Sequence, residues 1–221
     1  MKRFFPLVAF IAMLLTLTAC IDDNNNDYYN VGMGTLQKNN RQYNIVFDGD
    51  KSAYAIPDST LIAYRNLRKP GQRVIAMYNI ISEGRGENQR AISLRDIFEV
   101  LTKGFVPAPT DEAASKALGQ DITSVSEAWI AGGCINIKFS VPTCSYTVKP
   151  HLINAYDTGL NDSDGNRIIE FRHHLNGNSP QYWSAYSYAS FMLPKDESNP
   201  KSYVLRFQYS QNEKRVINVE N

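Results

Sequence analysis

The sequence predicts an all-β protein in two parts, a small barrel followed by an antiparallel β-sandwich. Two observations predict this class: short runs in which apolar and polar residues alternate, and turn-forming residues between the runs. Residues 135–141 alternate Ile, Ile, Phe and Val with Asn, Lys and Ser. That two-residue period is typical of a strand with one buried face. The only helix that we expect covers residues 111–118, with Thr110 as its cap.

The remaining strands are expected wherever β-branched and aromatic residues are dense. In chain order the expected strands cover residues 43–47, 73–81, 91–101, 135–141, 151–156, 167–175, 186–193 and 203–209. Turn formers such as Asp48-Gly49 and Asp164-Gly165 separate them. Pro142-Thr143 is expected to turn the chain directly after residues 135–141.

A proline-rich segment followed by the expected helix predicts the boundary between the two parts. We therefore divide the chain into a signal peptide (1–19), a tether (20–30), a barrel (31–107), a linker with the short helix (108–120) and a sandwich (121–221). About four or five strands fall in the first folded part and about six or seven in the second, which are typical numbers for a small barrel and a sandwich.

The N-terminus has the pattern of an export signal. Lys2 and Arg3 precede an uncharged apolar run that reaches Thr18. Leu17-Thr18-Ala19-Cys20 then matches the lipobox of bacterial lipoproteins, in which a diacylglyceryl group is attached to the cysteine thiol. We expect Cys20 to carry the lipid, palmitate included, and to anchor the chain without spanning the membrane. The alternative is an ordinary signal peptide that happens to end in a cysteine.

Residues 21–27 are polar and acidic, as in a solvated tether. Isoleucine, and not aspartate, follows Cys20 directly, and aspartate at that position would favour retention in the inner membrane. We therefore expect an outer-membrane location, on the periplasmic or the surface-exposed face. The acidic run is either a surface-export signal or a plain linker.

The charge balance argues against nucleic-acid binding. The chain has 23 Lys and Arg against 22 Asp and Glu. Because Lys2 and Arg3 belong to the signal, residues 20–221 have a formal charge near −1. Nucleic-acid-binding domains usually carry a basic excess.

Several stretches, taken in order, give the chain a resemblance to the NigD-like lipoproteins. They are the lipobox, Tyr43–Asp48, Gly71–Val74, Asp121-Ile122 leading to Trp129, Ile135–Phe139, His151–Asn154, Ile169–His173 and Ala189–Leu193. The resemblance implies an N-terminal OB-like barrel, a C-terminal β-sandwich, and an association with bacteriocin operons in which an immunity role has been suggested. It implies no catalytic residue.

The main candidate binding surface is the aromatic stretch Tyr182, Trp183, Tyr186 and Tyr188. On one extended strand Tyr182, Tyr186 and Tyr188 would share a face, with Trp183 on the other. Exposed rings of this kind bind protein partners or stack on sugars. The alternative is that they cover one face of a sheet. The first hypothesis is therefore a non-enzymatic, partner-binding lipoprotein, and the alternative function is a glycan-binding accessory lipoprotein.

The other reactive residues predict no catalytic or metal site, and we expect no cofactor. His173 and His174 are adjacent on a strand and point to opposite faces, so a metal site would need His151 and a carboxylate such as Glu170 or Asp157. Structural histidines are the preferred interpretation. A disulfide between Cys134 and Cys144 is allowed by export but disfavoured by the expected turn. Residues 161–166 fit a calcium loop poorly and favour a hairpin loop.

Overall fold

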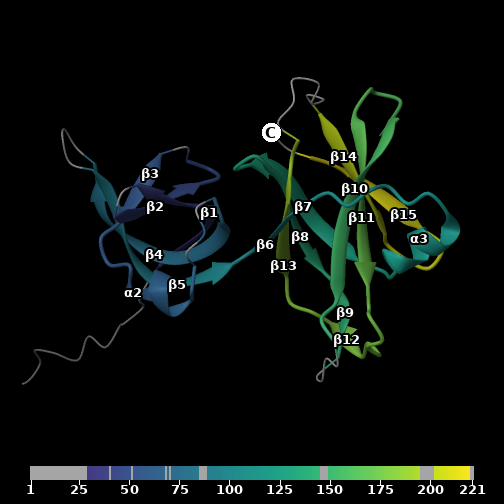
Figure 1. The fold of residues 1–221 in the computed structure, drawn as a ribbon, viewed down its shortest axis with the longest axis horizontal. Helices are drawn as coiled ribbons and strands as arrows, with labels where there is room; N and C mark the ends of the chain where they lie inside the picture. The colour runs from purple at the N-terminus through teal and green to yellow at the C-terminus, as the bar shows by residue number, and fades with distance from the viewer. Residues whose placement is uncertain are drawn as a thin grey trace, which may run out of the picture.

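The structure, a computed structural model, describes residues 29–39, 41–50, 52–67, 69, 71–84, 89–144, 149–194 and 202–219. The predicted signal peptide, Cys20 and all but the last two residues of the predicted tether lie outside these residues. Two β-rich bodies lie side by side, with strands β1 to β5 in one and β6 to β15 in the other (Figure 1). The all-β prediction is confirmed.

The first body is a five-stranded barrel with one short helix. Its elements are β1 (Asn30–Asn39), β2 (Gln42–Phe47), β3 (Ala53–Ile56), α2 (Thr60–Tyr64), β4 (Arg73–Glu83) and β5 (Arg90–Glu99). The strands close in the order β1-β2-β3-β5-β4, and β1 is antiparallel to both β2 and β4. β3 and β5 meet in parallel at Ala55 and Ala91. Five strands in this closed arrangement confirm the predicted OB-like barrel.

The barrel interior is filled by branched side chains from every strand. Wholly or almost wholly buried examples are Leu36, Ile45, Ile56, Val74, Ile92 and Ile97. Burying each such side chain contributes about 1.5–3 kcal/mol. Helix α2 adds Ile62, which has no exposed surface. This helix is not expected from the sequence, because its five residues are too few to show a helical period.

The second body is a sandwich of two four-stranded sheets with a two-stranded ribbon. One sheet has the order β6-β13-β8-β7 and contains β6 (Leu101–Gly104), β13 (Ser187–Met192), β8 (Cys134–Ser140) and β7 (Ser124–Ala131). The other has the order β10-β11-β14-β15 and contains β10 (Leu152–Asn161), β11 (Arg167–His174), β14 (Tyr203–Gln208) and β15 (Lys214–Asn218). The ribbon pairs β9 (Pro142–Thr143) with β12 (Tyr182–Trp183).

Aromatic rings from both sheets form the core between them. Phe171 of β11 lies edge-on to Phe139 of β8, with ring centroids 5.1 Å apart, and to Phe191 of β13 at 6.1 Å. Edge-to-face pairs at such distances contribute about 0.5–1.5 kcal/mol beyond their buried area. Most strand pairs are antiparallel as predicted, but β6 runs parallel to β13 and β14 parallel to β11.

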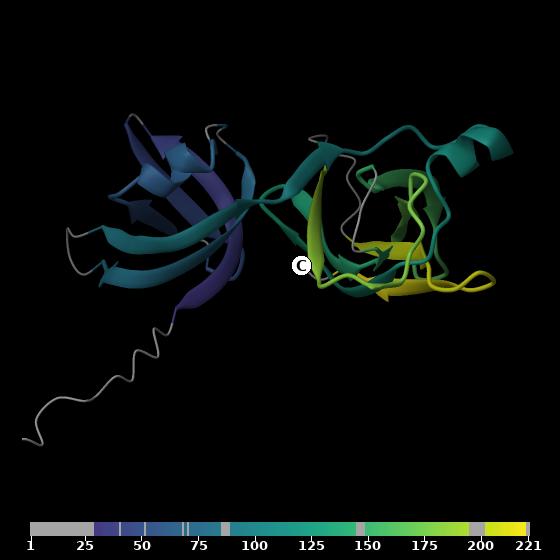
Figure 2. The same cartoon turned by 90° about the horizontal axis from the view of Figure 1, so that it is seen from below.

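The domain boundary lies earlier in the chain than the sequence indicated. The sequence predicts a barrel over residues 31–107, yet β6 lies inside that range and pairs with β13 of the sandwich. The expected strand over residues 91–101 is in fact β5, followed after Val100 by the start of β6. The chain passes from the barrel to the sandwich between these two strands (Figure 2). The proline-rich segment therefore lies within the sandwich and does not separate the two bodies.

Two local predictions fail for identifiable reasons. The helix α3 (Glu112–Ala117) is capped by Asp111 and not by Thr110, because the Asp111 carboxylate accepts a hydrogen bond from the Ala114 amide at 2.7 Å. Pro142-Thr143 does not form a tight turn. It is strand β9, because β12 returns to pair with it.

Candidate binding sites

Three aromatic side chains at one end of the sandwich are largely exposed. Tyr182 and Trp183 form β12, and Tyr186 comes just before β13. Their exposed fractions are 49%, 48% and 60%, although aromatic rings are on average well buried. Tyr188, in β13, is half-buried. We call Tyr182, Trp183 and Tyr186 the aromatic edge.

Backbone hydrogen bonds hold this segment against β9. The Gln181 amide donates to the Thr143 carbonyl at 2.7 Å, and the Ser184 amide donates to the Val141 carbonyl at 2.8 Å. The Ser184 hydroxyl also accepts from the Val141 amide at 3.0 Å. These contacts hold the segment of the rings in the β9–β12 ribbon.

The geometry of the edge differs from the one expected for a single extended strand. Residues 184–186 separate β12 from β13, so the alternation that would place Tyr182, Tyr186 and Tyr188 on one face is interrupted. Tyr186 instead stacks with a cation, the Lys138 ammonium, which lies 5.0 Å from its ring centroid. Lys138 is also paired with Glu127 at 2.6 Å.

A buried arginine joins the barrel to the sandwich. Arg73 of β4 has no exposed surface. Its guanidinium donates to the Asp48 carboxylate, to the Thr35 hydroxyl at 2.9 Å, and to the Asn136 side-chain oxygen at 3.2 Å. The first two partners belong to the barrel and the third to β8 of the sandwich. Buried charges of this kind are tolerated when they are paired and fully hydrogen-bonded.

The sandwich side of this junction is equally well bonded. The Trp129 indole donates to the Asp48 carboxylate at 2.8 Å. Asn136 accepts from the Ser190 hydroxyl at 2.7 Å, and its amide group faces three backbone carbonyls of the β7–β8 hairpin at 3.1–3.3 Å. The strand alternation predicted a solvent-facing Asn136. It is wholly buried because its face of β8 packs against Arg73.

Close packing at the junction also depends on Gly132. Its φ of +59° is in the left-handed region. A Cβ atom there would lie 2.5 Å from the Thr35 hydroxyl oxygen and 2.7 Å from an Arg73 nitrogen. The sequence did not identify this junction, although Asp48 and Trp129 belong to stretches on which the family resemblance rests.

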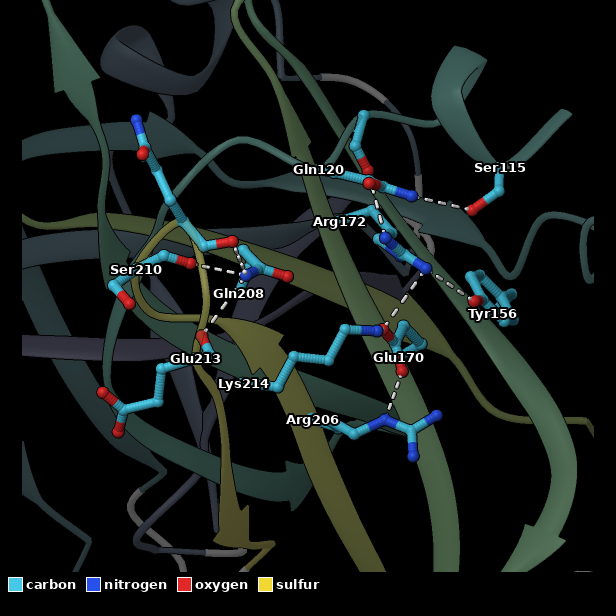
Figure 3. A network of polar contacts seen from close by, with 12 residues as sticks. Ser115, Gln120, Tyr156, Glu170, Arg172, Arg206, Gln208, Ser210, Glu213 and Lys214 are labelled. Carbon is cyan, nitrogen blue, oxygen red and sulfur yellow. Dashed lines mark hydrogen bonds and ion pairs between the residues drawn. The ribbon is translucent and has the colours of Figure 1, made fainter. Parts of the chain in front are cut away.

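A charge cluster around the buried Glu170 lies on the other sheet of the sandwich (Figure 3). Glu170 of β11 is 1% exposed and accepts from Arg206 at 2.5 Å and Lys214 at 2.7 Å, with Arg172 at 3.3 Å. Burial alone would raise the pKa of Glu170, but the bonds from Lys214 and Arg206 hold it below its usual value. Arg172 also donates to the Tyr156 hydroxyl at 3.1 Å.

Two of the histidines form a hydrogen-bonded pair. His173 Nδ1 lies 3.1 Å from the Ile122 carbonyl, and its Nε2 lies 2.9 Å from His151 Nδ1. Burial lowers the pKa of His173 to about 4, so its ring is neutral at neutral pH. Since a carbonyl only accepts, we assign the His173 proton to Nδ1 and the His151 proton to Nδ1.

The carboxylates considered for a two-histidine metal site are engaged elsewhere. Glu170 is surrounded by its three cations, and Asp157 binds Arg167 at 2.6 Å. His174 faces away from the pair and accepts from the Asn176 amide at 2.7 Å. Within the described residues, no group of three or more His, Cys, Asp and Glu side chains has the geometry to hold a metal ion.

The remaining sequence candidates have structural roles. Cys134 is buried, Cys144 is half-buried, and the two do not form a disulfide. In the loop after β10, the Asp162 carboxylate accepts from the Asn166 side-chain amide at 2.9 Å and from the Asn166 and Asp164 backbone amides at 2.8 and 3.0 Å. These bonds lower the pKa of Asp162 and close the hairpin loop. The described part of the chain has no helix with the length and hydropathy of a membrane span.

Solved structures share this arrangement at low sequence identity. A protein described as toxin-related from Parabacteroides distasonis is 20% identical with a TM-score of 0.68, over 86% of this chain and 92% of that one. A NigD-like immunity protein from Bacteroides caccae is 16% identical with a TM-score of 0.59, over 86% and 90%. A protein described as a lipoprotein from Bacteroides fragilis is 9% identical with a TM-score of 0.60, over 87% and 98%. At these identities the likeness concerns the fold.

No curated protein sequence matches the chain. The family comparison is more informative. Residues 106–220 match the model of the NigD-like C-terminal beta sandwich domain. This match covers more than half of the chain and contains every strand of the sandwich except β6. The resemblance seen in the sequence is confirmed, and the chain belongs to the NigD-like family.

Proposed function

We propose that the chain is a non-enzymatic, lipid-anchored protein of the cell envelope that binds a protein partner through the aromatic edge. The edge carries this proposal. Tyr and Trp are enriched at protein interfaces, where they contribute large contact areas at low entropic cost. The backbone around Tyr182, Trp183 and Tyr186 is hydrogen-bonded in the β9–β12 ribbon, yet about half of their surface is exposed. A preformed surface loses little conformational freedom on binding.

The envelope location rests on the N-terminal sequence. Attachment of a lipid to Cys20 would place the barrel next to the membrane and leave the sandwich, with the edge, as the following domain. The outer membrane is the proposed location. The neighbour described as a lipoprotein and the neighbour described as an immunity protein have the same fold, which supports an anchored, immunity-type role.

Site-specific photo-crosslinking tests the partner surface in native membranes. A benzophenone amino acid is placed at position 183 and, as a control, at position 64, where Tyr64 of the barrel is 78% exposed. We expect a discrete protein adduct at position 183 that disappears when Tyr182→Ala and Tyr186→Ala are added. Equal adducts at both positions, or none at 183, would contradict the proposal. An adduct sensitive to glycosidases would favour glycan binding at this edge instead.

The immunity role and the anchor have separate tests. Cells that lack this gene are complemented with the wild type, with the triple variant Tyr182→Ala/Trp183→Ala/Tyr186→Ala, or with Tyr64→Ala. The cells are then exposed to the protein that crosslinking has identified as the partner. We expect the triple variant to lose at least tenfold in protection and Tyr64→Ala to protect fully. Cys20→Ala should no longer incorporate labelled palmitate, and continued labelling would disprove lipidation at this residue.

A further inference from the structure

A concave site lies where the barrel meets the sandwich. It is a pocket of about 400 Å³, within the range of about 300–1,000 Å³ that is usual for small-molecule sites. Strands β1 and β2, the β2–β3 loop and β3 and β4 of the barrel line it together with Trp129 of β7. Neither the family match, which begins at residue 106, nor the proposed partner surface includes the barrel side of this pocket.

Aromatic rings make up much of the lining. Phe47 is stacked on Tyr78, with centroids 4.5 Å apart and planes inclined by 19°, and lies edge-on to Tyr54 at 5.6 Å. Gly32 lines the pocket beside these rings. A Cβ atom on Gly32 would come within 2.9 Å of the Phe47 ring and 3.5 Å of the Tyr78 ring. The Phe47 ring therefore packs directly against the Gly32 backbone. Phe47 and Tyr54 are only 6% and 7% exposed, so the half-buried rings of Tyr78 and Trp129 are the ones that a ligand can reach.

Two carboxylates line the same pocket, and an arginine neutralises each of them. Asp48 is paired with Arg73 and accepts from the Trp129 indole, both through Oδ2. Asp50 is paired with Arg90 at 2.7 Å. Within the described residues no hydrogen bond to Asp48 Oδ1 is made, and a carboxylate oxygen can accept two. The pocket therefore offers strong acceptors without net negative charge.

The ionisation of Asp50 is also fixed. Hydrogen bonds from the Tyr54 hydroxyl at 2.7 Å and the Ser52 amide at 3.0 Å, with the charge of Arg90, lower the pKa of Asp50 to about 2. The group is an acceptor only at any physiological pH.

We infer that this pocket binds a neutral saccharide unit. The faces of sugar rings carry C–H groups that pack on aromatic rings, and their hydroxyls donate to carboxylates. A cationic ligand would find both carboxylates already paired, and an anionic ligand would face them directly. The lining therefore fits a neutral, ring-shaped ligand with many hydrogen-bond donors. The site is distinct from the aromatic edge and does not depend on the partner proposed there.

A larger side chain at position 49 should fill the pocket and leave the fold intact. A Cβ atom on Gly49 would meet no atom within 4 Å, and the residue lines the pocket. Gly49→Leu should therefore occupy the space meant for the ligand. Gly104→Leu is the matched control, because Gly104 is equally open but lies outside this pocket.

Tryptophan fluorescence gives a local readout. The chain has two tryptophans, so Trp183→Phe leaves Trp129 in the pocket as the single probe. The full chain carrying Trp183→Phe is titrated with neutral hexose and N-acetylhexosamine oligosaccharides. Sulfated oligosaccharides and a tetralysine peptide serve as charged comparisons.

We expect at least one neutral oligosaccharide to change the Trp129 emission saturably. Gly49→Leu should weaken that binding at least tenfold, and Gly104→Leu should change it less than twofold. No response to any neutral sugar, a stronger response to a charged probe, or binding unaffected by Gly49→Leu would each overturn the inference. A failed crosslink at the aromatic edge would leave these outcomes unchanged, so the two proposals fail separately.

Discussion

The aromatic edge and the barrel pocket present the same kinds of side chain in opposite ways. Tyr182, Trp183 and Tyr186 are neighbours in the sequence and are displayed outward on a short ribbon. The pocket gathers Phe47, Tyr54, Tyr78 and Trp129 from four different strands and encloses them with two carboxylates. An exposed row suits a broad macromolecular surface, whereas a lined hollow suits a compact ligand. For the same reason, we expect the rings of the pocket to contribute more to the stability of the fold than the rings of the edge.

The largest expected effect is at the junction that holds the pocket together. Arg73→Met should lower the free energy of unfolding by about 3–5 kcal/mol, because it leaves the Asp48 carboxylate without its buried partner. Arg65→Met is the control, since the Arg65–Asp96 pair is partly exposed and should cost at most about 1 kcal/mol. Urea denaturation measures both. Similar losses for the two variants would show that the junction contributes no special stability.

As the pH falls, protonation should destabilise the sandwich before it neutralises the Asp50 carboxylate of the pocket. The ordinary pKa of histidine is 6.5, and burial lowers that of His173 to about 4. Between these pH values the unfolded chain binds a proton that the folded chain does not. The free energy of unfolding should therefore fall by about 3 kcal/mol as the pH drops from about 6.5 to 4. Asp50, with its pKa of about 2, stays ionised throughout this window.

His173→Gln tests this assignment through the pH dependence of the urea midpoint and not through stability at one pH. The variant should flatten the dependence between pH 6.5 and 4. If the urea midpoint of His173→Gln still depended on pH as in the wild type, the protonation that destabilises the fold would belong to another group.

The two tryptophans compare the regions directly. Trp129→Phe keeps a ring in the pocket but removes the hydrogen bond to Asp48, which should cost about 1–2 kcal/mol. Trp183→Phe should change stability by less than about 0.5 kcal/mol, because that ring is 48% exposed. Thermal unfolding of both variants at one pH gives the comparison. Equal effects would mean that the Trp129 bond is not needed for stability.

A similarly small effect is expected for Tyr186 of the edge. Tyr186→Ala removes a partly exposed ring and its contact with Lys138, which is worth about 0.5 kcal/mol. Tyr64→Ala, which removes a similar contact with Arg65 at 5.7 Å, is the matched control. Calorimetric unfolding should rank the two together. A loss above about 2 kcal/mol for Tyr186→Ala would make this ring part of the core and not a free surface.

The sequence predicts those features of this fold that repeat locally. Alternating residues predict β8 and β14 closely, and runs of β-branched and aromatic residues predict β2 and β11. The ribbon of β9 and β12 is not predicted, since two-residue strands have no period. Asn136 is buried although the alternation predicts that it faces solvent. Its partner Arg73 is 63 residues away in the chain, so the local sequence gives no sign of this contact.

The two candidate sites also differ in whether the local sequence reveals them. Tyr182, Trp183 and Tyr186 could be selected because a dense aromatic run is visible in the sequence. The pocket could not be selected, because Asp48 and Trp129 meet only once the barrel has closed and the β7–β8 hairpin has packed against it. Side chains that are separated by a whole domain give no local signal, even where each of them lies in a stretch that carries the family resemblance.

Arg73 also sets an order for the assembly of the molecule. All five barrel strands lie within residues 30–99, so the barrel can close before any strand of the sandwich exists. At that stage the side of the Arg73 guanidinium that later meets Asn136 still faces water. Only the arrival of the β7–β8 hairpin removes that hydration, and the bonds from Asn136 to Arg73 and from Trp129 to Asp48 then replace it. We therefore expect docking of the two bodies to be a late desolvation step, with a barrier that depends on how well that hairpin is already formed.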